Sequence, residues 1–235
     1  MATDDTDTAT SSGISRRRLL TGAGVAATGA VALAAAGAGT AEAGVPLTIA
    51  TGPPGGTVAE LRGRIQQTGS TGDTFTSYGF LYAATGATDD DLFDGGTTDV
   101  GHALLTVYGT GALVARVFDT AVHALDIDGT LTVYQRSAGG ADWSDPSSFA
   151  VGTAVGAFDV TIQDVLTVFA PGTGLPVLAG DLRQTMSRGL GGTLSGRRFG
   201  TRGQRLRMSA NGLGTLVDPT TFNSHHEIAG NWVAV

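Results

Sequence analysis

The chain has 235 residues, a formal net charge of −7 at pH 7 and no cysteine. An acidic protein has no bulk attraction to nucleic acid or to anionic membrane surfaces, so neither is an expected partner. The absence of cysteine excludes disulfides and thiolate chemistry. A chain of this length fits one domain with its own core.

The first 43 residues have the pattern of an export signal rather than of a folded element. A polar lead is followed by Arg16-Arg17-Arg18, a short soft run of Ala, Gly, Val and Leu, and an Ala-x-Ala site ending at Ala43. This arrangement predicts a twin-arginine signal peptide over residues 1–43, and hence a secreted, extracytoplasmic protein. The run falls short of the roughly 20 strongly apolar residues of a membrane helix, so we expect no stable membrane span.

Most of the chain after the signal is expected to form β-strands. Residues 44–56, rich in proline and glycine, predict an extended linker. The stretches that follow alternate apolar and polar side chains, and none has a convincing helical period. The expected strands are 58–67, 75–84, 102–109, 112–118, 121–127, 130–136, 149–169, 175–186, 204–210 and 227–235. They predict an all-β domain over residues 57–235, with a closed antiparallel barrel favoured over a sandwich because closure removes exposed strand edges.

Asp128-Gly129 has the composition of a two-residue hairpin turn between strands 121–127 and 130–136. That register would set His123 opposite Tyr134 on one face of the ladder. Either face could line the barrel interior. His123 and Tyr134 are therefore candidate ligand-binding residues.

The two longest strands, joined at residues 171–174, predict one long antiparallel hairpin in the barrel wall. The side chains expected to point inward with Asp164 are Ile162, Leu166 and Val168. A buried carboxylate must be hydrogen-bonded, paired or functional, so Asp164 is a candidate catalytic residue. Two arrangements stay open: Asp164 shares the interior with an arginine such as Arg183 or Arg116, or a bulge turns it outward.

Three other clusters of polar side chains stand out in the sequence. Arg205 and Arg207 share one face of their strand and are candidate ligand-binding residues for a carboxylate or phosphate, although a solvated outer face explains them as well. In His225-His226-Glu227, adjacent side chains point to opposite faces, so polar surface residues are favoured and we expect no metal or other cofactor. The acidic run 89–91 lacks the spacing of a calcium loop and should be solvated.

Three stretches resemble the allene oxide cyclase and dirigent-like β-barrel superfamily: GDTFTSYGFLY (72–82), DGTLTVYQ (128–135) and SFAVGTAVGAFDVTIQDVLTV (148–168). The resemblance implies an eight-stranded barrel with a largely apolar cavity, assembled as a homo-oligomer, a trimer or dimer. It also implies a cyclase or isomerase, or a dirigent guide that steers a reaction without attacking the substrate. The cyclases carry a first-strand carboxylate in the cavity, and Glu60 is the matching candidate.

Two functions remain open. The first is an exported barrel that binds a small apolar molecule, with cyclase, isomerase or dirigent-like chemistry, and it predicts a cavity with a few convergent polar groups. The alternative is a non-catalytic structural or interaction protein with a packed barrel and an apolar or arginine-rich outer patch. No nucleophile elbow or Ser-His-Asp set is recognisable, so nucleophilic catalysis is not expected.

Overall fold

The structure is a computed structural model of the chain, and it describes residues 47–235. The predicted signal peptide, residues 1–43, and the start of the predicted linker lie outside the described residues. Strands dominate the described part, whose helices are one single-turn α-helix and three short 3₁₀ turns. These proportions agree with the expectation of an all-β domain.

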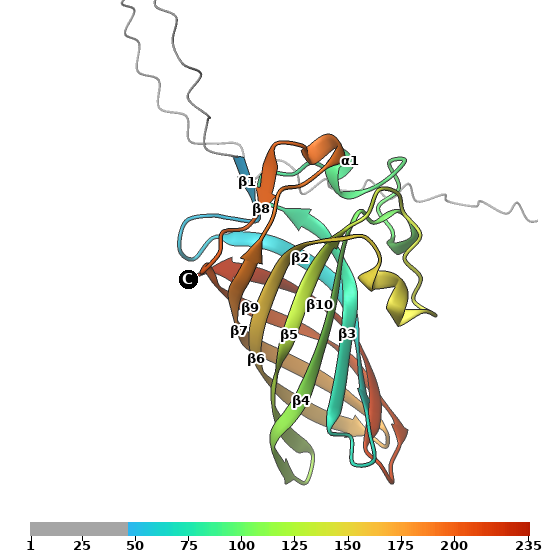
Figure 1. The fold of residues 1–235 in the computed structure, drawn as a ribbon. Helices are drawn as coiled ribbons and strands as arrows, with labels where there is room; N and C mark the ends of the chain where they lie inside the picture. Colours follow the sequence, from blue (N-terminus) through green and yellow to red (C-terminus); the bar gives the residue numbers. More distant parts are fainter. Residues whose placement is uncertain (1–46) are drawn as a thin grey trace, which may run out of the picture. The chain divides into compact units, whose positions relative to one another are not determined.

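Eight antiparallel strands close into a barrel, which confirms the predicted fold class (Figure 1). The order around the wall is β10, β2, β3, β4, β5, β6, β7, β9, so sequence neighbours are also neighbours in space except where β8 leaves the wall. Pairing of the last strand with β2 closes the meander. The wall strands are β2 (Thr57–Thr68), β3 (Thr74–Ala84), β4 (Leu105–Asp119), β5 (Val122–Gln135), β6 (Thr153–Ala170), β7 (Thr173–Ser187), β9 (Arg205–Asp218) and β10 (Asn223–Ala234).

The two ends of the barrel differ. At one end, the lower one in Figure 1, the wall strands are joined by short turns, and we call this the hairpin end. The other end carries the longer connections and is called the loop end. Its elements are β1 (Leu47–Ile49), α1 (Asp89–Leu92), η2 (Val100–His102), η3 (Pro146–Ala150), η4 (Gly192–Leu194) and β8 (Arg197–Phe199). β1 lies in the segment expected as a linker and pairs in parallel with β8.

Alternation along each strand separates the interior from the outer face. In β7 the even-numbered residues from Gly174 to Gln184 are buried and the odd-numbered ones are exposed. Large aromatic side chains fill the interior at the loop end, where the ring of Phe158 lies 5.4 Å from Trp232 and 6.5 Å from Phe199. Because Phe199 belongs to β8, the small outer sheet helps to plug this end. Open interior space is therefore left toward the hairpin end.

The predicted turn at Asp128-Gly129 is wrong. β5 runs straight through both residues, and Gly129 pairs with Gly111 on β4 and with Val160 on β6. A Cβ on Gly129 would lie 2.3 Å from the Thr110 carbonyl oxygen and 2.7 Å from the Gly111 Cα. Glycine is needed here because two backbones approach closely inside a curved wall, not because the chain turns.

Gly129→Ala is expected to lower the free energy of unfolding by about 1–3 kcal/mol, because the added methyl group must push two backbones apart. Thermal unfolding measures the change. The control is Gly189→Ala, whose Cβ would lie 3.9 Å from its nearest neighbour and which should stay within about 0.5 kcal/mol of the wild type. Equal stability of the two variants would contradict a packing role for Gly129.

The predicted long hairpin is confirmed. β6 and β7 pair antiparallel along their lengths, and Ala170 faces Thr173 across the turn. Ile162, Leu166 and Val168 share the inward face, as expected from their alternation. The strand begins later than predicted, because Phe149 belongs to η3, where its ring is buried 5.2 Å from Tyr78.

Candidate functional site

A cavity of about 240 Å³ lies inside the barrel at the hairpin end. Its apolar wall includes Phe118, Leu125, Leu166, Val168 and Phe222. Its main polar side chains are Gln67, His123, Ser224 and His226. No carboxylate and no arginine is among the described residues that line it. The cavity is thus apolar, uncharged at its walls and equipped with a few hydrogen-bonding groups.

Two glycines on neighbouring strands make room in this part of the barrel. Gly174 of β7 faces Gly214 of β9. A Cβ on Gly174 would lie 2.7 Å from Leu166 Cδ1, and one on Gly214 would lie 3.0 Å from His226 Nδ1. The missing methyl groups therefore let the leucine and imidazole side chains extend across the interior.

A chain of buried hydrogen bonds holds the histidine. Gln67 Nε2 donates to the Gly72 carbonyl oxygen at 2.5 Å, and Ser224 Oγ donates to Gln67 Oε1 at 2.9 Å. Ser224 Oγ also lies 2.8 Å from His226 Nε2. Gln67, Ser224 and His226 are each at most 8% exposed, so water does not replace these bonds. The chain joins β2 to β10, the pair that closes the barrel.

The protons of this chain have only one consistent arrangement. The amide nitrogen of Gln67 must face the Gly72 oxygen, which leaves Gln67 Oε1 as an acceptor for the Ser224 hydroxyl proton. With its only proton used, Ser224 Oγ accepts from Nε2–H of His226. The imidazole is therefore the Nε2–H tautomer, and Nδ1 carries a lone pair. Ser224 is not an activated nucleophile, because its hydroxyl proton points away from the histidine.

Burial, reinforced by the charge of His225, lowers the pKa of His226 to about 4. The imidazole is therefore neutral at pH 7. A neutral ring with one free lone pair offers a hydrogen-bond acceptor to the barrel interior.

His123 is the one predicted ligand-binding residue that lines the cavity. Its ring contacts that of Phe118 in a tilted arrangement, with centroids 4.4 Å apart. The predicted pairing with Tyr134 is wrong, because His123 faces Phe118 and Leu166 across the strands. Tyr134 lies toward the other end of β5, where it faces Thr106 and Ala154.

Asp164 points inward, as its alternation predicted, and is 4% exposed. Burial raises the pKa of Asp164 to about 7, and a hydrogen bond from the Val177 backbone lowers it by less. Its Oδ1 atom has no hydrogen-bond partner among the described residues. Both predicted arrangements are wrong, since no arginine pairs with it within residues 47–235 and the strand has no bulge at this point.

The two arginines proposed as partners of Asp164 serve elsewhere. Arg116 Nη2 donates to the carbonyl oxygens of Thr71 and Gly72, at 3.0 and 2.9 Å. Its guanidinium carbon lies 5.3 Å from the ring centroid of Phe118 and 5.3 Å from that of Phe222. Arg183 is exposed on the outer face of β7. Arg116 thus fastens the β2–β3 turn at the hairpin end.

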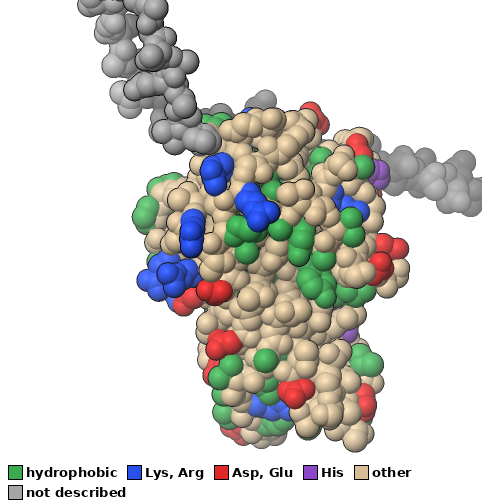
Figure 2. Space-filling model, viewed as in Figure 1, with side chains coloured by type: hydrophobic (Ala, Val, Ile, Leu, Met, Phe, Trp, Pro, Cys, Tyr) green, Lys and Arg blue, Asp and Glu red, His purple; other side chains and the backbone are tan. Residues whose placement is uncertain are grey.

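The remaining predicted site residues lie on the outside of the barrel. Glu60 shares the outer face of β2 with Arg62. The pKa of Tyr82 is raised first by burial of its phenol and then by the charge of Glu60 and a hydrogen bond to that residue. Arg205 and Arg207 are exposed on β9, and Arg207 lies 3.4 Å from Asp181. Figure 2 shows basic side chains gathered on the upper part of the visible face. The structure brings none of these residues to the cavity.

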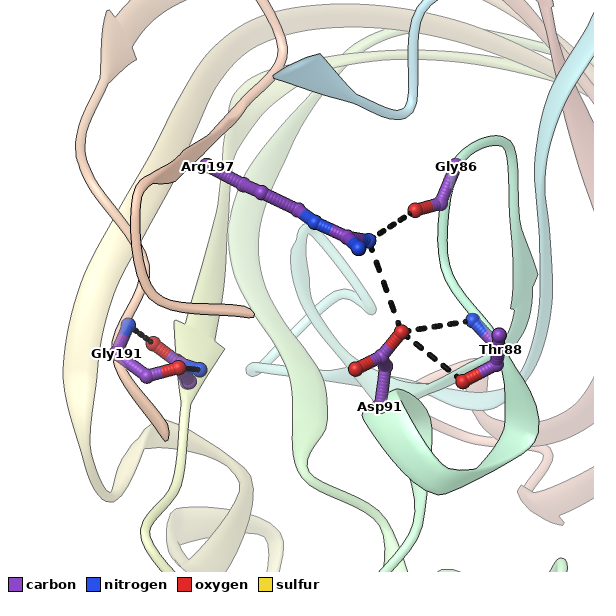
Figure 3. A network of polar contacts seen from close by, with 6 residues as sticks. Gly86, Thr88, Asp91, Gly191 and Arg197 are labelled. Carbon is purple, nitrogen blue, oxygen red and sulfur yellow. Dashed lines mark hydrogen bonds and ion pairs between the residues drawn. The ribbon is translucent and has the colours of Figure 1, made fainter. Parts of the chain in front are cut away.

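A second, more open hollow of about 710 Å³ lies at the loop end beside Asp91. The Asp91 carboxylate accepts from Thr88 N and Thr88 Oγ1, both at 3.0 Å, and lies 3.7 Å from Arg197 Nη1 (Figure 3). The backbone hydrogen bond from Thr88 lowers the pKa of Asp91. Arg197 also donates to the Gly86 carbonyl oxygen. These bonds tie the loops together and Asp91 is only 8% exposed, so the expectation of a solvated loop is wrong for this residue.

Exposed apolar side chains follow the outer face of five neighbouring strands at the hairpin end. We call them the outer apolar belt, and they are Val117, Val122, Phe169, Leu175, Val177 and Leu213. Val122 of β5 and Leu175 of β7 both face Thr167 of β6, so these two belt residues lie on either side of one threonine. Figure 2 shows apolar side chains interspersed with acidic ones on the visible face of this end.

Comparison with known proteins finds no family model, no curated protein and no solved structure that matches this chain. Within residues 47–235, no set of three or more His, Asp or Glu side chains could hold a metal ion. No helix in the same part of the chain is long and apolar enough to cross a membrane.

Sequence reasoning missed His226, which was assigned to the surface and is 3% exposed. Ile228, Trp232 and Ala234 are buried on the same face of β10. Extending that alternation backward reaches His226 and Ser224, so the signal was present in the strand pattern.

Proposed function

We propose that the protein binds a small, mostly apolar molecule in the cavity at the hairpin end of its barrel. The cavity of about 240 Å³, with apolar walls and a few polar groups, carries the proposal. Ligand sites commonly combine such walls with a small number of orienting hydrogen-bonding groups. An apolar cavity of about 150 Å³ is enough to bind benzene, so this cavity suits a single ring with a short substituent.

The candidate acid–base groups of the barrel favour a protein that binds its ligand without catalysis. A general base works best when its pKa lies near the working pH and when it reaches the substrate. His226 has a pKa of about 4, and Asp164, whose pKa is about 7, is not among the described residues that line the cavity. Glu60, the carboxylate that the family resemblance offers for a cyclase, lies on the outer face of β2. Cyclase or isomerase activity therefore draws its support from the resemblance alone, whereas a dirigent-like guide needs only the cavity. The N-terminal arginine motif supports a site of action outside the cytoplasm.

The binding test is NMR titration with toluene, observed on the methyl groups of Leu125 and Leu166. Saturable shifts are expected for the wild type. Val168→Trp should abolish them, because Val168 lines the cavity and the larger ring fills it. The control is Thr167→Trp, on the exposed outer face of the same strand, which should leave the shifts intact. Absence of shifts in the wild type, or the same loss in both variants, would overturn the proposal.

A second candidate function is an interaction protein that uses the outer apolar belt. Its six side chains are between 44% and 64% exposed, and large exposed apolar side chains gathered at one end of a protein are typical of a contact site. Homo-oligomers, dimers or trimers, are the form that the resemblance suggests. Native mass spectrometry of residues 44–235 separates the two functions, since it reports oligomeric state and retained ligand together.

A further inference from the structure

We infer that the ligand of this cavity is a neutral molecule with a hydrogen-bond donor, an alcohol hydroxyl or an N–H, which it gives to Nδ1 of His226. The inference rests on the proposed binding function and adds the chemical class of the ligand. It depends on the direction of the hydrogen bonds around His226.

The free lone pair of the His226 ring lies on the nitrogen that faces the cavity. His226 uses Nε2 for its bond to Ser224, so Nδ1 is the ring nitrogen that remains. Nδ1 lies beside the inner face of Gly214, where a Cβ would be 3.0 Å away, and both residues line the cavity. None of the described residues donates a hydrogen bond to Nδ1. Nδ1 is therefore an acceptor on the cavity wall that the described residues leave unpaired, and a donor carried by a ligand can bind to it.

The described residues that line the cavity offer no opposite charge to an ionic ligand. No carboxylate and no arginine is among the described residues that line the cavity, so neither a cation nor an anion finds an opposite charge there. Moving an ion into such surroundings is costly, which favours a neutral ligand.

The two histidines of the cavity differ in how deeply they are buried. His123 is only partly buried, so water can satisfy its ring nitrogens. His226 is 3% exposed and its tautomer is fixed by Ser224 and Gln67. The specific polar contact of the site is therefore an acceptor, and it discriminates between ligands that carry a donor and ligands that do not.

Cyclohexanol and cyclohexanone are the matched probes, because they share ring and size while only the alcohol can donate. One hydrogen bond predicts that the alcohol binds about 2- to 10-fold more tightly, measured by NMR titration of the wild type. Equal affinities, or tighter binding of the ketone, would overturn this inference and leave the proposed function standing. Binding of neither probe would overturn both.

Gln67→Met provides the sharper test. Without the amide oxygen, the Ser224 hydroxyl turns to donate to Nε2, and the imidazole proton moves to Nδ1. The cavity then presents a donor, from which both the alcohol and the ketone oxygen can accept, so the preference for cyclohexanol should be lost. The control is Gln66→Met, on the outer face of the same strand, which should keep the preference for the alcohol.

A measurement on the wild type needs no variant and no ligand. Long-range ¹H–¹⁵N correlation of the histidine rings distinguishes the two tautomers directly. His226 is expected to be protonated at Nε2 and bare at Nδ1. The opposite tautomer would remove the basis for a donor-bearing ligand.

Discussion

Asp164→Asn is expected to raise the free energy of unfolding by about 3 to 4 kcal/mol at pH 8, relative to its effect at pH 4. At pH 4 the buried acid is neutral in the native protein and resembles the amide. At pH 8 the wild-type carboxylate is ionised inside an apolar barrel, with no arginine beside it among the described residues. The amide removes that charge, and any pH-independent cost of the substitution cancels in the comparison.

The sign follows from the number of bound protons. The pKa of Asp164 is about 7 in the native protein and 3.8 as an ordinary aspartate. Between these values the unfolded chain has released a proton that the native protein keeps. The contribution of Asp164 to the free energy of unfolding therefore falls by about 1.4 kcal/mol per pH unit as pH rises, and is flat above pH 7.

The measurement is urea unfolding of wild type and variant at half-unit steps from pH 4.5 to pH 8. Asp128→Asn is the control, because Asp128 is exposed on the outer face of β5, and its difference from the wild type should not depend on pH. A constant difference for Asp164→Asn over this range would show that Asp164 is not buried as a protonated acid.

The barrel could be predicted from the sequence because one face of every wall strand is buried. The alternation in β7 and β9 is regular enough to assign inward residues such as Leu182, Leu206 and Met208 without a structure. Strand lengths were harder to predict, since Gly111 and Gly129 read as breaks. In the structure they pair with each other inside continuous strands. The sequence alone does not distinguish a glycine in a turn from a glycine at which two backbones approach closely.

The candidate site was only partly predictable. The inward position of Asp164 follows from local alternation, which extends over a few residues, whereas alternation left open which face of its strand carries His123 to the interior. The bond from Ser224 to Gln67 joins residues 157 positions apart, and the closure of the barrel alone brings them together. The lone pair on His226 depends in turn on that bond. Local patterns therefore predict which residues face the interior, whereas the direction of their hydrogen bonds requires the complete wall.

His226→Phe is expected to change the pH dependence of stability in the opposite direction to Asp164→Asn. The pKa of His226 is about 4 in the native protein and 6.5 as an ordinary histidine. Between these values the unfolded chain binds a proton that the native protein does not, so the contribution of His226 to the free energy of unfolding rises with pH. The gain is about 3 kcal/mol from pH 4 to pH 6.5, and it is lost as pH falls back through this window.

In the wild type, Asp164 and His226 make opposite contributions to the slope of stability against pH, and these two contributions cancel each other. From about pH 4.5 to pH 6.5 the slope from Asp164 is negative and the slope from His226 is positive, each about 1.4 kcal/mol per pH unit, so their sum is close to zero. His226→Phe should therefore lose stability relative to the wild type as pH rises, and Asp164→Asn should gain it. The double variant should keep only the rise that comes from His225, whose pKa is lowered by burial. The carboxylates of Asp91 and Asp218, whose pKa values are lowered, titrate below this range. Parallel pH profiles for the two single variants would contradict the burial of one group or the other.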